Sequence, residues 1–142
     1  MKTFHLEVVT PEKIAFAGEV EMVSAPSVEG VLGILAGHAP LFAKLTGGEL
    51  KILKEGKEDF FSLGEGFMEV VPEKTTVLVT RAVNADELDE ETLLKAKRAA
   101  EEALRQGPKG EALVSAQALL RSILIDLKVK KRRKGMGYGT RG

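Results

Sequence analysis

The feature that most constrains the fold is a change of composition at Asn84. Before this residue, short apolar runs are repeatedly broken by Gly and Pro. After it, the stretch from Asp86 to Arg105 contains neither and is rich in Ala, Leu, Glu, Lys and Arg. Gly and Pro disfavour helix interiors, whereas these five residue types are strong helix formers. We therefore expect a strand-rich part, residues 1–84, followed by a helical part.

Residues 1–84 show the period-two alternation of apolar and other residues that is typical of strands. Phe4-Leu6-Val8 alternates with polar residues, and Leu50 and Ile52 alternate with Glu49 and Lys51. The segment Lys54-Glu55-Gly56-Lys57 predicts a tight β-hairpin. Many short strands separated by turns predict a β-sandwich or barrel.

Residues 85–134 predict two helices that fold back on each other. Asp89 is expected to cap the first helix, because its carboxylate can accept from the free N–H groups of the first turn. The segment 106–110 ends that helix, and so short a loop predicts an antiparallel hairpin. The expected seam consists of Leu93, Ala96, Ala100, Ala103 and Leu104 against Leu113, Ala116, Leu120, Ile123, Leu124 and Leu127.

The first side of this seam is mostly alanine and buries little area per residue. The hairpin is therefore expected to leave its docking site without losing its helices. The last segment, residues 135–142, has Gly at four of eight positions and predicts a disordered tail.

Charge is unevenly distributed, although the formal net charge is zero. All 21 acidic residues lie at or before Asp126, whereas seven of the 21 basic residues follow it. The basic run 128–134 suits a solvated helix end, favoured by the helix dipole, or an acidic partner. The residues alone leave both interpretations open.

No catalytic or metal-binding pattern stands out. The absence of Cys excludes disulfides, thiolate nucleophiles and cysteine-based zinc sites. His5 and His38 are not paired with carboxylates at zinc-site spacing, and no nucleophile elbow or phosphate loop is present. A Ser-His-acid triad assembled in space stays open from the residues alone. They predict no metal site and no inserted membrane segment.

The segment Gly33–Leu41, GILAGHAPL, places His38 among aliphatic residues. Gly37 and Pro40 predict a turn closed by an imidazole hydrogen bond. A catalytic base would need a partner, which the neighbouring residues do not supply. We expect this loop to form a contact surface.

Taken together, these stretches resemble the epsilon subunit of the rotary proton-translocating ATP synthase of bacteria. The segment from Glu29 to Leu41, EGVLGILAGHAPL, resembles the most distinctive motif of that family, with Ala36 where Pro is usual. The similarity runs from Leu6 to about Lys130. It also includes Val8–Glu12, Gly48–Ile52, Gly64–Val70 and Val77–Val79 in family order.

This resemblance implies a β-sandwich of about ten strands over residues 1–84, followed by an antiparallel two-helix hairpin over 85–134. It implies a non-catalytic central-stalk subunit of a hetero-oligomer, peripheral on the cytoplasmic face of the bacterial plasma membrane. That subunit contacts gamma and the membrane c-ring and couples proton-driven ring rotation to ATP synthesis. The implied contact residues are Glu29, Gly30, Gly33, Gly37, His38, Ala39 and Pro40.

The resemblance also implies that the hairpin extends into the alpha/beta catalytic head and inhibits ATP hydrolysis. The implied contacts are Arg121, Lys128, Lys130, Lys131, Arg132, Arg133 and Lys134. The alternative is a nucleic-acid-binding module with a basic tail. That hypothesis leaves the sandwich unexplained and supplies only Tyr138 for base stacking, so we expect no nucleic-acid partner.

Some bacterial epsilon subunits bind ATP where the first helix begins, through Ile or Leu, Asp, two variable residues, Arg and Ala. Here Leu88 and Asp89 match, but Thr92 and Leu93 replace the Arg and the Ala. Arg98 is the candidate for a later basic position. The missing Arg removes a charge-assisted contact, so Asp89 and Arg98 predict weak ATP binding or none, and no other cofactor is expected.

Overall fold

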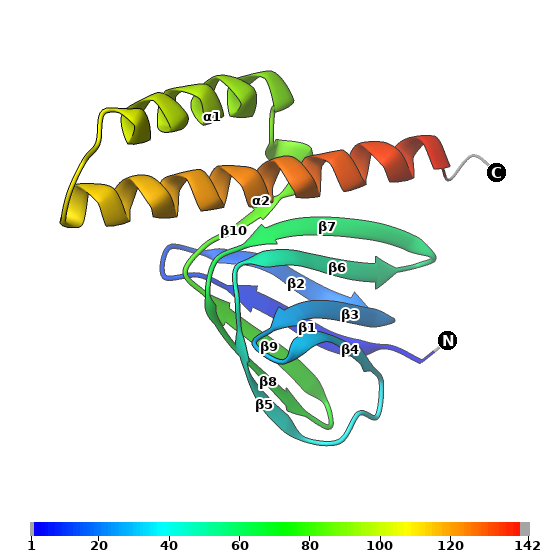
Figure 1. Cartoon of the computed structure of the whole chain (residues 1–142). Coiled ribbons are helices and arrows are strands. Elements are labelled where there is room, and N and C mark those ends of the chain that lie inside the picture. The colour runs from blue at the N-terminus through cyan, green and yellow to red at the C-terminus, as the bar shows by residue number, and fades with distance from the viewer. Residues whose placement is uncertain (1, 140–142) are drawn as a thin grey trace. The chain divides into compact units, whose positions relative to one another are not determined.

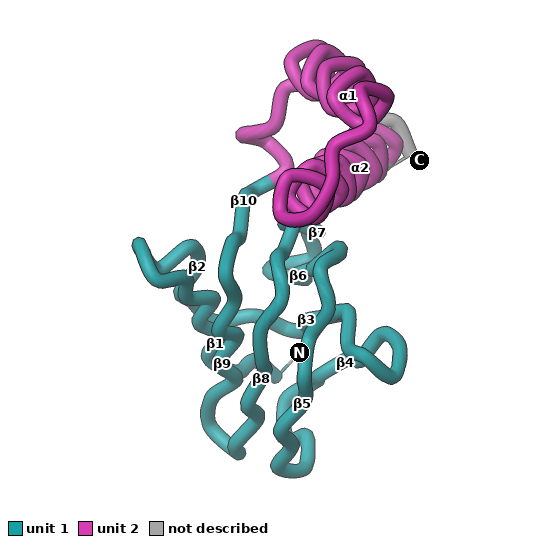
Figure 2. Tube along the Cα trace, turned by 60° about the vertical axis from the view of Figure 1, so that its left-hand side comes forward, with its two compact units in different colours: residues 1–84 teal, residues 85–142 magenta. Residues whose placement is uncertain are grey.

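The structure, a computed structural model, describes residues 2–139, with side chains described as far as Gly135. The chain divides into two compact units, Met1–Asn84 and Ala85–Gly142 (Figure 2). Unit 1 holds ten strands: β1 (Phe4–Val9), β2 (Ile14–Val20), β3 (Met22–Ser27), β4 (Gly30–Leu35), β5 (Leu41–Leu45), β6 (Gly48–Lys54), β7 (Lys57–Leu63), β8 (Gly66–Val71), β9 (Lys74–Val79) and β10 (Ala82–Asn84) (Figure 1).

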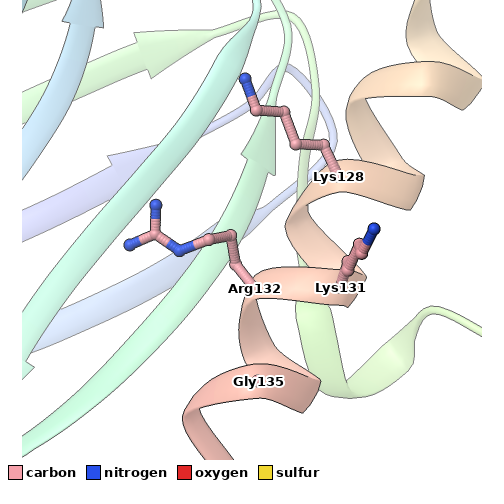
Figure 3. A pocket seen from close by; sticks show the side chains of 4 residues that line it. All are labelled: Lys128, Lys131, Arg132 and Gly135. Atoms are coloured by element: carbon pink, nitrogen blue, oxygen red, sulfur yellow. The ribbon is translucent and has the colours of Figure 1, made fainter.

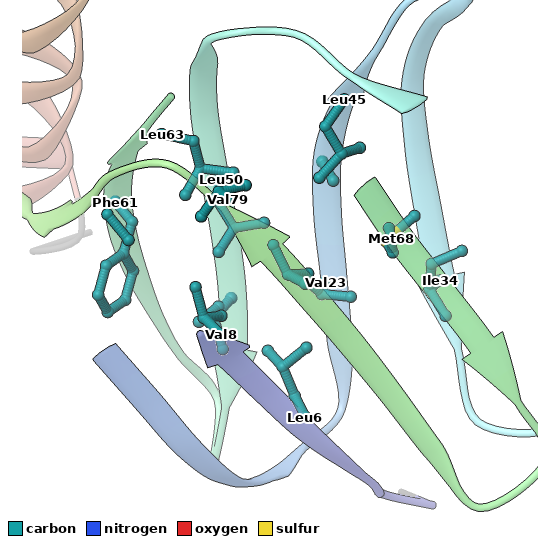
Figure 4. Close-up of a cluster of buried hydrophobic side chains, with 14 of the residues drawn as sticks. Leu6, Val8, Val23, Ile34, Leu45, Leu50, Phe61, Leu63, Met68 and Val79 are labelled. Atoms are coloured by element: carbon teal, nitrogen blue, oxygen red, sulfur yellow. The ribbon is translucent and has the colours of Figure 1, made fainter. Parts of the chain in front are cut away.

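The strands form one curled sheet in the order β10-β7-β6-β3-β5-β8-β9-β1-β2, with β4 also paired to β3. β1 and β9 are parallel, and the other pairs are antiparallel. The predicted β-sandwich is thereby confirmed. Buried residues alternate along β1, β3 and β6. Leu6 and Val8 of β1 point inward and meet Val23, Leu50 and Met68 from the other strands (Figure 4). All five are 0% exposed, so a dry apolar core holds the sheet together.

The hairpin between β6 and β7 is confirmed, with Lys54 paired to Lys57. Its two central residues, Glu55 and Gly56, have φ of 52° and 77°. Positive φ at both positions defines a type I′ turn, which matches the right-handed twist of the flanking strands. Gly adopts this conformation readily, whereas the Cβ of Glu55 makes it costly.

We predict that Glu55→Asn stabilises unit 1 by about 0.5–1 kcal/mol, because Asn tolerates the left-handed conformation better than Glu. Urea unfolding of the full chain measures the change. Glu55→Gln is the matched control, since it removes the charge but keeps a side chain unsuited to positive φ. An equal gain in both variants would show that charge, rather than turn conformation, limits stability here.

Unit 2 consists of a short 3₁₀ turn, η1 (Ala85–Glu87), and two helices, α1 (Glu90–Arg105) and α2 (Glu111–Gly139). Asp89 caps α1 as predicted, accepting a hydrogen bond from the N–H of Thr92 at 2.9 Å. Gly107 and Gly110, with φ of 72° and 60°, let the chain reverse between the helices. The antiparallel hairpin is therefore confirmed.

The seam between α1 and α2 is thinner than expected. On α1, Ala100 is buried and Leu93, Ala96 and Leu104 are partly buried, but Ala103 is exposed. On α2, Leu124 is 45% exposed. Ala103 and Leu124 therefore do not belong to the buried stripe, although each lies three or four residues from a member of it.

In the structure α2 continues to Gly139, beyond the predicted hairpin boundary at Lys134, while the disorder of the tail stays a prediction. Extending an existing helix adds one backbone hydrogen bond for each residue ordered, which offsets the cost of Gly in this stretch. The rest of the predicted tail, residues 140–142, lies outside the described residues.

Candidate partner-binding surfaces

The motif EGVLGILAGHAPL forms the turn between β3 and β4, β4 itself and the loop that follows. At the first turn, Gly30 has φ of 115°, and the hydroxyl of Ser27 accepts from the N–H of Glu29 at 3.1 Å. Val28 and Val31 flank this turn and are 56% and 74% exposed. Two large apolar side chains at a well-formed turn, surrounded by solvent, are typical of a contact surface.

The loop after β4 is closed as the sequence predicts. The N–H of His38 donates to the carbonyl of Leu35 at 3.1 Å, and Gly37 has φ of 82°. Nδ1 of His38 lies 2.7 Å from the carbonyl oxygen of Ala39. A carbonyl can only accept, so Nδ1 of His38 is the donor in this contact.

The seven motif residues predicted to bind partners do not form one patch. Glu29 and Gly30 lie at the start of β4, whereas the group from Gly37 to Pro40 follows its end. At about 3.3 Å per residue, these turns are roughly 20 Å apart along the strand. Gly33 lies between them, paired with Ser24. The motif therefore presents two separate turns joined by β4.

An exposed apolar stripe that the sequence did not predict lies across β5, β8 and β9. Phe42, Phe67 and Leu78 are 67%, 44% and 50% exposed. The rings of Phe42 and Phe67 stack with centroids 5.4 Å apart, and Phe67 is paired with Leu78. Phe67 and Leu78 also line a shallow groove of about 420 Å³. We call Phe42, Phe67 and Leu78 the outer stripe.

A signal for the outer stripe does exist in the sequence. In β5 and β8 the inward positions are taken by Leu45 and Met68, so Phe42 and Phe67 occupy positions that solvent-facing residues normally fill. That signal can be recognised only once it is known which alternate residues of each strand face the core. Aromatic residues on the outer face of a sheet mark candidate interfaces.

The basic residues predicted to contact an acidic partner fall into separate groups on α2. Lys130, Arg133 and Lys134 contact the start of unit 2, and the carbonyl of Ala85 accepts from Lys130 at 3.1 Å. Arg121 is exposed two turns earlier. Figure 3 shows the remaining group, which lines a hollow of about 350 Å³ together with Gly135: Lys128, Lys131 and Arg132.

The two candidate nucleotide residues are not brought together. Both the N–H and the hydroxyl of Thr92 donate to Asp89, at 2.9 and 2.6 Å, and these bonds lower the pKa of that carboxyl. Arg98 is exposed and lies nine residues further on, about 180° around α1 at 100° per residue. Weak or absent ATP binding stays a prediction.

Within residues 2–139, no group of three or more His, Asp or Glu side chains could hold a metal ion. No helix in this range is long and apolar enough to cross a bilayer.

Residues 3–85 match the protein family described as "ATP synthase, Delta/Epsilon chain, beta-sandwich domain". The chain is 43% identical over 129 residues to the ATP synthase epsilon chain of Herpetosiphon aurantiacus, which covers 91% of this chain and 95% of that one. The chain belongs to the ATP synthase epsilon family. It is also 41% identical over 133 residues to the epsilon chain of Alkalilimnicola ehrlichii, covering 93% of this chain and 95% of the relative.

Solved structures share the epsilon fold. A chain in the mitochondrial ATP synthase of Euglena gracilis, in a structure of its OSCP, F1 and c-ring, superposes with a TM-score of 0.71 at 24% identity, covering 94% of this chain and 80% of that one. A chain from the central stalk and c-ring of the Tetrahymena thermophila mitochondrial enzyme gives 0.55 at 16% identity, covering 93% and 96%. The epsilon family predicted from the sequence motifs is confirmed by the family match and by the similar epsilon chains.

Proposed function

We propose that this epsilon chain is a non-catalytic subunit of the central stalk of an ATP synthase, where it couples proton-driven ring rotation to ATP synthesis. Identity of about 40% to epsilon chains, over nearly their whole length, is the observation that carries this proposal. The chain would be peripheral on the cytoplasmic face of the bacterial plasma membrane. The basic-tailed nucleic-acid alternative gains no support from this family membership.

Two separate surfaces of unit 1 suit two different partners. We assign the two turns of the motif, with exposed Val28 and Val31 beside Gly30, to the c-ring. We assign the outer stripe to the gamma subunit. Stacked aromatic residues give a large apolar contact at little entropic cost, because each ring has only two rotatable bonds.

The hairpin of unit 2 would restrain ATP hydrolysis by extending toward the alpha/beta catalytic head. The thin seam supports this, because Ala96 and Ala100 bury little area that extension would expose. The basic residues of α2 supply charge complementary to an acidic surface of the head. Extension acts as a brake only if the head binds the extended state better than the closed state by several kcal/mol.

The test is a pull-down of the assembled stalk with tagged epsilon, after nuclease treatment. The unaltered chain should recover gamma and ring subunits, whereas Phe42→Glu with Phe67→Glu should lower gamma recovery at least tenfold. Buried aromatic residues at interfaces commonly contribute about 2 kcal/mol each, and the introduced charges would be desolvated. Ile14→Glu, at a position 60% exposed on β2, is the matched control.

Three outcomes would count against the proposal. Recovery that disappears after nuclease treatment would favour a nucleic-acid-binding module. Failure to recover gamma and ring with the unaltered chain would remove the stalk assignment. Normal gamma recovery with the double variant would show that gamma binds elsewhere, while leaving the stalk role intact.

A further inference from the structure

The basic segment of α2, residues 128–134, presents two sets of cations on different sides of the helix. Lys130, Arg133 and Lys134 follow the i, i+3, i+4 spacing that places side chains on one face, and we call them the latch set. A second set, Lys128, Lys131 and Arg132, repeats this spacing two residues earlier. At 100° per residue, the two sets are centred about 160° apart around the helix.

All three members of the latch set contact one short acidic segment. Lys130 donates to the carbonyl of Ala85 at 3.1 Å, Arg133 to the carboxylate of Asp86 at 3.0 Å, and Lys134 to Glu90 at 2.9 Å. These acceptors belong to η1 and the first residue of α1. Each contact joins residues 44 to 47 positions apart in the chain, so it exists only while the hairpin is closed.

The contacts lie at the open end of the hairpin, where no loop connects α1 to α2. The loop at Gly107–Gly110 connects the far ends of the helices, while the end of α2 meets the start of α1 without a covalent link. Between these two ends, α1 supplies the seam largely with small residues such as Ala96 and Ala100. Weak apolar packing leaves charge contacts a larger share of the closing free energy.

We propose that the latch set and the segment 85–90 form an ionic latch that holds the hairpin closed, and that an acidic partner must compete with this segment for the same cations. The latch pairs are partly exposed. Arg133 and Asp86 have side chains 39% and 60% exposed, and Lys134 and Glu90 have 56% and 44%. Such pairs are weak singly and are screened by salt. The latch is thus adjustable by ionic strength.

The latch also decides which cations a closed hairpin can offer. In the closed state, Arg133 and Lys134 are engaged by the carboxylates of Asp86 and Glu90, and Lys130 is engaged by the carbonyl of Ala85. Lys128 and Lys131 are exposed on the other side of α2. Opening therefore adds three cations to the basic surface. The existence of the latch does not depend on the proposed function, but its bearing on ATP hydrolysis rests on that function.

The full chain contains no Cys, so two introduced cysteines can carry spin labels without competing reactions. Lys95→Cys on α1 and Gly135→Cys on α2 are both exposed sites outside the latch. Pulsed electron–electron resonance then gives the distance distribution between the helices. Reversing Arg133 and Lys134 to Glu is expected to raise the open fraction about three- to tenfold, because two exposed pairs are lost and like charges face each other.

The matched control is Lys128→Glu with Lys131→Glu, which makes the same change of net charge on the other side of α2. It should leave the distances unchanged. Raising salt from low to high should open the unaltered chain but have little effect on the latch variant. Exchanging the charges, with Asp86→Arg and Arg133→Asp together, should restore the closed distances that Arg133→Asp alone loses.

Equal opening in the latch variant and its control would overturn the proposal, since net charge would then be the cause. Unchanged distances in the latch variant would overturn it as well. Circular dichroism checks that the helices remain, and Arg133→Gln with Lys134→Gln replaces the Glu variant if they do not. Because the isolated chain is measured, these outcomes do not depend on whether the hairpin inhibits ATP hydrolysis.

Discussion

Replacing Gly66 by alanine is expected to destabilise unit 1 by about 3 kcal/mol or more, because the added methyl group has no room. A Cβ at this position would lie 1.9 Å from the carbonyl oxygen of Leu78 and 2.7 Å from Cα of Val79. Both atoms belong to the backbone of β9, whose register with β8 pairs Gly66 with Val79. Backbone atoms cannot rotate aside, so the strands must separate locally.

Urea unfolding of the full chain, followed by circular dichroism at strand wavelengths, measures this loss. The matched control is Gly33→Ala in β4, where the only neighbour within 4 Å is the flexible end of Met22 at 3.4 Å. The control should change stability far less than Gly66→Ala. A Gly66→Ala chain as stable as the unaltered one would mean that β8 and β9 do not approach as closely as described.

Truncation after Gln106 is expected to leave assembly of the ATP synthase intact and to raise its ATP hydrolysis several-fold. The sandwich carries its own buried core and keeps both proposed contact surfaces, so binding to gamma and the ring should persist. The truncation removes α2 with all of its cations. Each 1.4 kcal/mol of preference for the extended state changes the ratio of extended to closed hairpin about tenfold. Loss of the extended state should therefore give a measurable rise in the rate of ATP hydrolysis.

The measurement is steady-state ATP hydrolysis by membranes that also show coupled proton pumping. Truncation after Lys134 is the control, because it keeps both helices of the hairpin and the whole basic segment. Hydrolysis should rise only with the shorter chain. If an assembled and coupled enzyme hydrolyses ATP at the same rate with either truncation, the inhibitory role is removed, while the stalk assignment stands.

Much of unit 1 could be predicted because strand patterns are local. Alternation at Leu6 and Val8 gives the inward phase of β1, and Gly56 marks the turn between β6 and β7. The site was less predictable. Phe42 and Phe67 are 25 positions apart and become a stacked pair only when β5 lies beside β8. No spacing rule along the chain links them.

The same distinction applies to unit 2. The sequence alone determined that Asp89 caps a helix, that two helices form a hairpin, and that the α1 side of their seam is mostly alanine. These properties depend on residues within one or two helical turns. It also determined that the end of α2 is basic. Only the tertiary structure decided which of those cations face the segment 85–90. Ion pairs require charged atoms within about 4 Å of each other. Here the paired residues are more than forty positions apart in the chain, so only the packing of the helices brings them together.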